Sequence, residues 1–322
     1  MYKKVKQFIA THNLVRNNDT IIVGLSGGPD SVFLLHFLAT LQKELSLTLI
    51  VAHLNHEWRP QADQEEQLCR EIAHTLGLPF VTSKISQLCV PFKSNGSKEE
   101  YARKIRRYFF EKLAQEHNAD SIALAHHLDD QKETFFIRLI RGSSLTGLTA
   151  INARNGLYIR PLLETSKHEI LDWLHAHTIT YAIDASNTSD LYLRNRIRSH
   201  VIPALQSCDD RFDTNFLTTL NRLKQTEHFL QRLTTDAFTH IATRTNNAWA
   251  INTAQLSATD VALHHRIIIH WLIAEHVPFP TTQSFFDELL RFLFSEKGGT
   301  HAIHPQWAII KKQKSAHIVR MP

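Results

Sequence analysis

The first half of the chain repeats one pattern, in which a short apolar run is followed by a longer stretch with helical spacing. The apolar runs are Thr20–Ser26, Leu47–Leu54, Phe80–Ile85 and Ser121–His127. The helical stretches that follow them cover residues 30–42, 61–76, 99–117 and 130–140. This alternation predicts an α/β fold, a parallel sheet with helices on both faces. Such sheets bind ligands at the carboxyl ends of their strands, so we expect the functional residues there.

The pattern changes after about residue 210. Helical spacing then covers residues 213–241, 262–275 and 282–295, and short strand-like pieces follow around 300–303, 307–310 and 316–319. We therefore predict two domains. Residues 1–210 form the parallel-sheet domain, and residues 211–322 form a smaller, mainly helical α+β domain.

Composition sets broad limits on the class of protein. The chain has 322 residues, and 43% of them are hydrophobic, which is too many for a disordered protein. The formal charge of +5 permits an RNA partner without requiring one. The cysteines Cys69, Cys89 and Cys208 lie far apart, so no disulfide framework, zinc site or iron–sulfur site is predicted. No apolar signal core or long charge-free run is present, so we expect a cytoplasmic protein without a membrane partner.

The most informative motif is the loop Ser26-Gly27-Gly28-Pro29-Asp30-Ser31, between the first apolar run and its helix. Two glycines allow a tight turn that brings backbone amides close to an anion, and the helix start adds unpaired N–H groups. Asp30 would repel a phosphate unless a bound Mg²⁺ lay between them. The loop lacks the Gly-Lys-Ser/Thr ending of a Walker A motif, which argues against γ-phosphate transfer. The alternative is a plain strand–helix turn with Ser and Asp caps.

The motif Ser-Gly-Gly-x-Asp-Ser resembles the PP-loop of the ATP pyrophosphatase superfamily. Members of that superfamily split ATP between its α and β phosphates, transfer AMP to a carbonyl oxygen and release pyrophosphate. The resemblance implies that ATP is a substrate and that Mg²⁺ is bound at Asp30 through phosphate. It also implies that the pyrophosphate end of ATP is held by Ser26, Gly27, Gly28, Pro29, Asp30 and Ser31.

Further motifs lie near the predicted strand ends and beyond them. They are His53–Arg59, Glu99–Arg103 with Arg106, His126–Thr134, Arg138–Gly142, Arg160–Leu163, Asp184–Asn187 and Arg194–Arg198. In content and order they resemble the tRNA(Ile)-lysidine synthase family, over roughly the first two thirds of the chain. That family adenylates C2 of the wobble cytidine of the isoleucine tRNA with a CAU anticodon. Free L-lysine then displaces AMP and forms lysidine, so the resemblance implies an ATP-dependent ligase that forms a C–N bond.

The acidic pair suits this chemistry. Asp130 and Glu133 lie three residues apart at a predicted helix start, so they share one face and could hold a lysine ammonium or accept its proton. Such a pair beside ATP needs a countercharge, which Arg106 or Mg²⁺ could supply. By resemblance, Arg106, Asp130 and Glu133 form the lysine and adenylation site, and His53 and His126 lie near the nucleotide. The alternatives are an acidic helix cap for residues 129–133 and zinc ligation by His126 and His127.

Contacts with tRNA are predicted at Arg59, Arg194 and Arg198, with a solvated basic face as an equally good interpretation of the last two. Trp58 could stack on a base or pack as a half-buried aromatic. The domain after residue 210 is expected to assist tRNA binding, although it carries no motif that we can interpret.

Two positions depart from the family pattern. Ile183 stands where the family has Glu, and Ser144 stands where it favours Gly. The nearest alternative function is a PP-loop tRNA 2-thiolation enzyme, which usually needs paired cysteines. A ligase acting on a small metabolite and a nonenzymatic nucleotide sensor are more distant alternatives. The oligomeric state is left open, with a homodimer as one candidate.

Overall fold

The computed structural model describes residues 1–58, 60–91, 98–182, 192–245 and 248–321, without the side chains of residues 98 and 99. Arg59, Ile183 and the Asp184–Asn187 motif lie outside the described residues. The chain divides into two compact units, Met1–Leu220 and Asn221–Pro322. This division falls within helix α10 (Phe212–Ile241), about ten residues beyond the boundary expected from the sequence.

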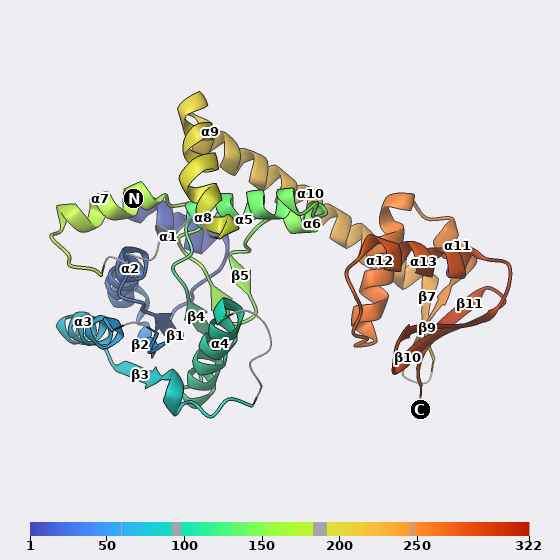
Figure 1. The fold of residues 1–322 in the computed structure, drawn as a ribbon, viewed down its shortest axis with the longest axis horizontal. Helices are drawn as coiled ribbons and strands as arrows, with labels where there is room; N and C mark the ends of the chain where they lie inside the picture. Colours follow the sequence, from blue (N-terminus) through green and yellow to red (C-terminus); the bar gives the residue numbers. More distant parts are fainter. Residues whose placement is uncertain (59, 92–97, 183–191, 246–247, 322) are drawn as a thin grey trace. The chain divides into compact units, whose positions relative to one another are not determined.

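The first unit is built on a six-stranded sheet with the strand order β3-β2-β1-β4-β6-β5 (Figure 1). The strands are β1 (Thr20–Gly24), β2 (Thr48–Asn55), β3 (Phe80–Lys84), β4 (Ser121–Ala123), β5 (Arg154–Asn155) and β6 (Tyr158–Ile159). All neighbours pair in parallel except β5 and β6, which form an antiparallel pair at the edge. The parallel α/β sheet predicted from the sequence is confirmed, whereas the β5–β6 pair was not predicted.

The sheet has helices on both faces. The helices of this unit are α1 (Tyr2–Thr11), α2 (Pro29–Leu45), α3 (Ala62–Thr75), α4 (Lys98–Glu116), α5 (Leu128–Ile140), α6 (Leu145–Leu148), α7 (Lys167–Ala176), α8 (Leu193–Arg196) and α9 (Ile202–Cys208). A short 3-10 turn covers Ile85–Gln87, and a π-helical turn joins α8 to α9 at Ile197–Val201.

The side chains of β1 alternate between two hydrophobic cores, as the pleat of a strand requires. Ile21 and Val23 pack with residues of α1, α2, α3 and α7, whereas Ile22 packs with residues of α4. Figure 1 shows α2 and α4 on opposite sides of the strands. Phe33 of α2 is completely buried, and burial of a side chain of this size contributes about 1.5–3 kcal/mol. The two cores therefore fix the helices whose ends reach the candidate site.

The register of the strands brings three loops to one edge of the sheet. Gly24 pairs with Ala52 of β2, and Val23 pairs with Ala123 of β4. Because the strands are parallel, the segments that follow β1, β2 and β4 emerge on the same side. Each of these segments carries one of the motifs predicted to be functional.

The second unit contains the end of α10 and an antiparallel five-stranded sheet with the order β7-β8-β11-β10-β9. Its strands are β7 (Ala242–Thr245), β8 (Ala248–Asn252), β9 (Gly299–His304), β10 (Trp307–Lys312) and β11 (Ser315–Arg320). Its helices are α11 (Thr253–Ser257), α12 (Val261–Ala274) and α13 (Gln283–Phe294). The last three strands confirm the prediction, but β7 and β8 were missed.

The core of this unit surrounds Trp271 of α12, which is completely buried and donates its indole N–H to the carbonyl oxygen of Trp249, 3.1 Å away. Arg266 of α12 forms two hydrogen bonds of 2.9 and 2.7 Å with the carboxylate of Glu227 on α10. Among the described residues, no helix combines the length and apolarity needed to cross a membrane.

Candidate active site

A cavity of about 810 Å³ lies at the carboxyl ends of β1, β2 and β4. This volume falls in the range of about 300–1,000 Å³ that is usual for small-molecule sites. The residues predicted to bind ATP that line it are Ser26, Gly28, Pro29, Asp30, Ser31, His53 and His126. Arg106 also lines the cavity, as do Trp58 and Lys167. The structure thus brings together residues from loops that are far apart in the sequence.

The loop after β1 has a backbone that depends on its first glycine. Gly27 has a φ of +82°, and a Cβ atom there would lie 3.3 Å from the Sγ atom of Cys69. The hydroxyl of Ser31 accepts the Ser26 amide hydrogen at 3.1 Å and donates to the carbonyl oxygen of Gly28 at 2.9 Å, which closes the turn. Pro29 then begins α2, where its fixed φ suits the first helical position. The helix N-terminus beside the cavity suits a phosphate.

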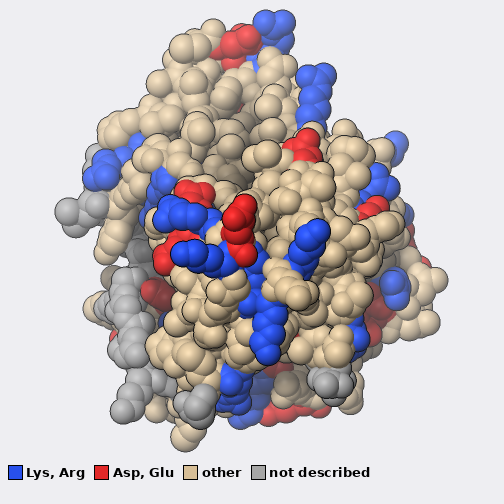
Figure 2. All heavy atoms as spheres, turned by 90° about the vertical axis from the view of Figure 1, so that its right-hand side faces the viewer, with Lys and Arg blue, Asp and Glu red and all other residues tan. Residues whose placement is uncertain are grey.

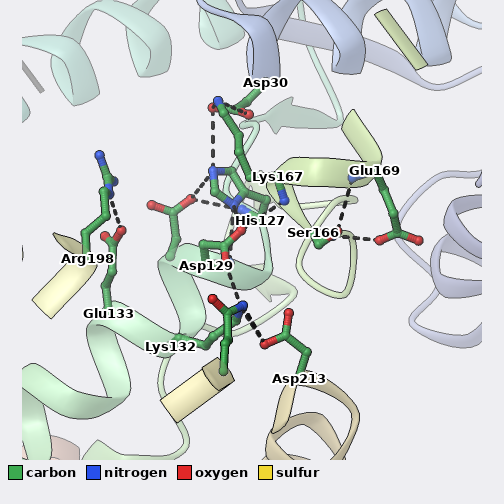
Figure 3. A network of polar contacts seen from close by, with 12 residues as sticks. Asp30, His127, Asp129, Lys132, Glu133, Ser166, Lys167, Glu169, Arg198 and Asp213 are labelled. Atoms are coloured by element: carbon green, nitrogen blue, oxygen red, sulfur yellow. Dashed lines mark hydrogen bonds and ion pairs between the residues drawn. The ribbon is translucent and has the colours of Figure 1, made fainter. Parts of the chain in front are cut away.

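Asp30 of this loop is paired with a lysine that the sequence analysis did not identify. The Nζ atom of Lys167 lies 2.6 and 2.7 Å from the two carboxylate oxygens of Asp30 (Figure 3). Burial alone would raise the pKa of Asp30, but His127 and Lys167 outweigh it and lower the pKa below its usual value. Asp30 is therefore a carboxylate with a nearby cation that could also reach a phosphate.

Lys167 is held in place by the start of α7. Ser166 caps this helix: its hydroxyl accepts the Glu169 amide hydrogen at 3.2 Å, and the Glu169 carboxylate accepts the Ser166 amide hydrogen at 2.8 Å (Figure 3). The pattern Ser-x-x-Glu was a visible signal for this helix start. It could have placed Lys167 at a helix N-terminus, but only the fold shows that this N-terminus lies beside Asp30.

One imidazole connects the loop to the acidic residues after β4. The Nε2 atom of His127 lies 3.5 Å from a carboxylate oxygen of Asp30 and 3.6 Å from one of Asp130. In the neutral ring, Nδ1 accepts the Asp129 amide hydrogen at 3.2 Å; in the charged ring, it faces the Asp129 carboxylate at 3.5 Å. Burial lowers the pKa of His127, but the carboxylates of Asp129, Asp30 and Asp130 outweigh it and raise the pKa to about 10.

Asp129 anchors the start of α5. Its two oxygens bind the Nζ atom of Lys132 at 2.6 Å and the backbone N–H of Lys167 at 2.9 Å. Lys132 is completely buried and also binds Asp213 of α10 at 2.8 Å (Figure 3). Hydrogen bonds and the nearby Lys132 outweigh burial and hold the pKa of Asp129 well below its usual range. Asp129 thus ties the start of α5 to Lys132 and α7, whereas the cap contact is made by Asp130, which accepts the backbone N–H of His127 at 3.0 Å.

The predicted pair of Asp130 and Glu133 is confirmed to share one face of α5, but its countercharge differs from the expectation. Arg194 binds Asp130 at 2.6 Å and Glu133 at 2.5 Å, and Arg198 binds the other oxygen of Glu133 at 2.5 Å. Arg106, which was expected here, instead contacts His56 through Nη2 and Nε2 at 3.0 Å. Arg106 lines the cavity, whereas Asp130 and Glu133 are not among its lining residues.

Arg194 and Arg198 therefore do not form a freely solvated face, because both guanidinium groups are bound to carboxylates. Glu133 is completely buried between them. Two cations thus occupy the positions where the ammonium group of a substrate could bind. Their predicted contact with RNA stays a prediction, as does that of Arg59.

The two histidines near the nucleotide site are both held mainly neutral. Burial lowers the pKa of His53, whose Nδ1 lies 2.9 Å from the carbonyl oxygen of Leu25. Burial also lowers the pKa of His126; Asp130 opposes this effect, but the charges of Arg160, Arg194 and Arg103 reinforce it and bring the pKa to about 4. Among the described residues, no group of three or more His, Cys, Asp or Glu side chains is arranged to hold a metal ion. Zinc ligation by His126 and His127 thus gains no support from the described residues.

Two further arginines of α4 and α5 have local partners. Arg138 donates to the carbonyl oxygens of Gly147 and Ala150 at 2.6 and 2.7 Å, so it braces the segment after α6. Arg107 pairs with Glu111 at 2.7 Å. Trp58 is 40% exposed and packs near the ring of His56, with centroids 5.0 Å apart.

Two curated relatives of this chain are tRNA(Ile)-lysidine synthases. The tRNA(Ile)-lysidine synthase of Bacillus subtilis (strain 168) is 35% identical over 310 residues, covering 94% of this chain and 65% of that protein. The tRNA(Ile)-lysidine synthase of Geobacter sulfurreducens is 39% identical over 238 residues, covering 73% of this chain and 50% of that protein. The chain thus spans less than two thirds of the length of these relatives.

Similarity to solved structures supports the fold. The U34-tRNA thiolase NcsA from Methanococcus maripaludis, solved with its 4Fe–4S cluster, superposes with a TM-score of 0.58 at 19% identity, covering 69% of this chain and 77% of that one. The family model described as the PP-loop domain matches residues 1–205, which contain the loop, the cavity and the acidic pair. The chain belongs to the PP-loop domain family.

Proposed function

We propose that the protein is a tRNA(Ile)-lysidine synthase. In this reaction the C2 oxygen of the wobble cytidine attacks the α-phosphate of ATP, an O–P bond forms and pyrophosphate leaves. The amino group of free L-lysine then attacks C2, the C–O bond breaks, AMP leaves and the amine loses a proton. The reaction makes the protein an ATP-dependent ligase that forms a C–N bond.

The observation that carries this proposal is the position of His127. Its Nε2 atom lies 3.5 Å from Asp30 of the PP-loop and 3.6 Å from Asp130 of the acidic pair. The imidazole of His127 therefore lies between the phosphate-binding loop and the carboxylate pair. Adenylation needs the first of these sites and attack by lysine needs the second, so the two must be adjacent. The similarity to two curated lysidine synthases supports the same assignment.

Each group has a proposed role in this chemistry. The loop from Ser26 to Ser31 and the N-terminus of α2 bind the pyrophosphate end of ATP. When ATP binds, the ammonium group of Lys167 leaves Asp30 and binds a phosphate oxygen instead. When lysine binds, Arg194 and Arg198 give up their contacts with Asp130 and Glu133, which then bind the ammonium group of lysine or accept its proton. His126, kept neutral, is suited to accept or donate a hydrogen bond near the nucleotide.

Mg²⁺ fits this site as an ion that arrives with ATP. Magnesium usually keeps several water molecules and binds proteins through one or two carboxylates together with substrate phosphates. Asp30 lines the cavity beside the loop and supplies one such carboxylate. Bound there, Mg²⁺ would neutralise charge on the phosphates of ATP.

We further propose a catalytic domain over residues 1–210 and a C-terminal part, residues 211–322, that assists tRNA binding in the cytoplasm. On the face in Figure 2, basic and acidic side chains are interspersed on a largely uncharged surface.

The deciding experiment supplies purified protein with ATP, Mg²⁺, L-lysine and an unmodified isoleucine tRNA transcript with a CAU anticodon. We expect AMP release only when tRNA and lysine are both present, and mass spectrometry of the digested tRNA should show cytidine joined to lysine with loss of water. A sulfur-for-oxygen mass change would instead identify 2-thiolation. AMP release without tRNA would refute both assignments.

A cysteine variant separates the two chemistries further. Cys69 is completely buried and burial raises its pKa to about 12, so it is a poor source of thiolate. Cys89 and Cys208 are exposed. We expect the combined variant Cys69→Ala, Cys89→Ser and Cys208→Ser to form lysidine, since an amine nucleophile needs no protein thiol.

A further inference from the structure

Arg103, Arg106 and Arg160 lie near the nucleotide cavity. Arg103 and Arg106 lie three residues apart on α4, so they share one face of the helix. Arg160 directly follows β6, which pairs in parallel with β4 through Ala123 and Ile159. The backbone N–H of Leu124 donates to the carbonyl oxygen of Ile159 at 2.9 Å, so Arg160 emerges at the edge where the histidines follow β4.

These arginines lack the acidic partners that the other arginines of the site have. Among the described residues, none of the three forms an ion pair with a carboxylate. Arg106 contacts the Nε2 atom of His56 through Nη2 at 3.0 Å. Arg160 donates through Nη1 to the carbonyl oxygen of Asn152 at 3.0 Å, and its buried Nε has no hydrogen-bond partner in the described structure.

The nearby acids are already bound elsewhere. Glu100 pairs with Lys104 at 3.1 Å, and Glu111 pairs with Arg107 at 2.7 Å. Both pairs join residues one turn apart on the exposed side of α4, and such pairs are worth only about 0.3–0.5 kcal/mol. Among the described residues, these two carboxylates are thus bound by Lys104 and Arg107 instead of the three arginines.

The charge of Arg103 acts on each of the other two arginines. Desolvation first, and then the charge of Arg103, lower the pKa of Arg106 and also that of Arg160. Like charges held together without acids destabilise the free protein. They become favourable when an anion with several oxygens binds, because a guanidinium group binds phosphate through paired hydrogen bonds.

We propose that Arg103 and Arg160 form a binding site for one backbone phosphate of the RNA substrate, next to the nucleotide whose base enters the cavity. Arg106 lines the cavity, but Arg103 and Arg160 are not among its described lining residues. A ligand that reaches all three arginines must extend past the cavity. The phosphates of ATP have their own site at the PP-loop, the start of α2 and Lys167, whereas an RNA chain continues beyond its target base.

The site would allow the enzyme to hold the anticodon loop by its backbone while the base is read elsewhere. Backbone contacts fix register and carry no direct sequence information. This inference rests on the proposed action on tRNA, because it assigns a group of that same substrate.

The test measures binding of the unmodified CAU transcript to Arg103→Gln, Arg160→Gln and the double variant by fluorescence anisotropy over a series of KCl concentrations. We expect each single variant to bind about tenfold more weakly at low salt, because a charged hydrogen bond to phosphate is lost. The slope of log affinity against log salt should fall by about 0.7 in the double variant, which is the value for one phosphate of a single strand. Each single variant should keep most of its slope, because the remaining arginine still neutralises the same phosphate.

Arg107→Gln is the matched control, because Arg107 lies on the same helix but is paired with Glu111. It should retain the wild-type slope. Binding of a non-hydrolysable ATP analogue should be unchanged in all four variants, and this also verifies that each one is folded.

Three outcomes overturn the inference. The slope of the double variant could match that of the wild type, or it could fall by about 1.4, which would assign two phosphates instead of one. Alternatively, the variants could lose affinity for the ATP analogue while RNA binding is kept, which would assign the site to the nucleotide. Failure of the wild-type protein to bind or modify the transcript would be a different result, because it refutes the proposed function itself.

Discussion

Lys167 offers the most direct test of how the loop binds ATP. The change Lys167→Met keeps the length of the aliphatic side chain and removes the ammonium group that lies 2.6 and 2.7 Å from the oxygens of Asp30. If this ammonium moves to a phosphate oxygen when ATP binds, the variant lacks one charged hydrogen bond in the reacting complex. Such a bond is worth about 1.5–3 kcal/mol, so kcat/KM for ATP should fall by about 10- to 150-fold.

The effect on stability should be much smaller than the effect on catalysis. The Lys167 side chain is 35% exposed and that of Asp30 is 25% exposed, so solvent screens their interaction. Asp30 also keeps His127 at 3.5 Å, and we expect a loss of only about 1 kcal/mol in the free energy of unfolding. Urea denaturation measures this loss, and pyrophosphate release at saturating lysine and tRNA measures kcat/KM.

Lys4→Met is a matched control. Lys4 pairs with Glu169 on the same helix at 3.0 Å, and both side chains are well exposed, so kcat/KM should not change. A Lys167→Met variant whose kcat/KM stays within about threefold of wild type would refute a phosphate contact and leave Lys167 as a structural partner of Asp30.

Three further predictions concern the acidic segment. Glu133→Gln removes the charge between Arg194 and Arg198, and steady-state kinetics should show half-saturation for lysine rising about tenfold or more with little change for ATP; unchanged lysine dependence would remove Glu133 from the lysine site. Lys132→Met leaves Asp129 and Asp213 without their buried cation, so urea denaturation should show that the free energy of unfolding falls by about 2–4 kcal/mol. The exposed control Lys112→Met should lose less than about 0.5 kcal/mol, and equal losses would refute the buried-pair argument. The pKa of His127 is raised from 6.5 to about 10 on folding, so the stabilising contribution of its charge is complete below pH 6.5 and is lost as pH rises towards 10. Over this range the free energy of unfolding should therefore decline less in His127→Gln than in the wild type, and identical pH profiles would show that the ring is not charged.

Local patterns in the sequence sufficed for the elements that frame the site. The apolar run before Ser26, the two glycines and the following helix are consecutive, so a single stretch of chain contains the information for the strand, turn and helix. The same holds for Asp130 and Glu133, whose spacing of three residues places them on one face of α5. The strands β7 and β8 escaped detection because they are short and their side chains do not alternate between apolar and polar residues.

Which charged side chains pair with each other in the site, in contrast, was decided only by the tertiary structure. Lys167 and Asp30 are 137 residues apart in the chain, and Arg194 and Glu133 are 61 apart. No periodicity in the sequence relates such positions, because they meet through the order of strands in the sheet and the path of the helices that follow. The sequence analysis placed Arg106 beside the acidic pair because of the family resemblance and the need for a countercharge. The fold instead directs Arg106 towards His56 and supplies Arg194 and Arg198 from a helix that follows much later in the chain.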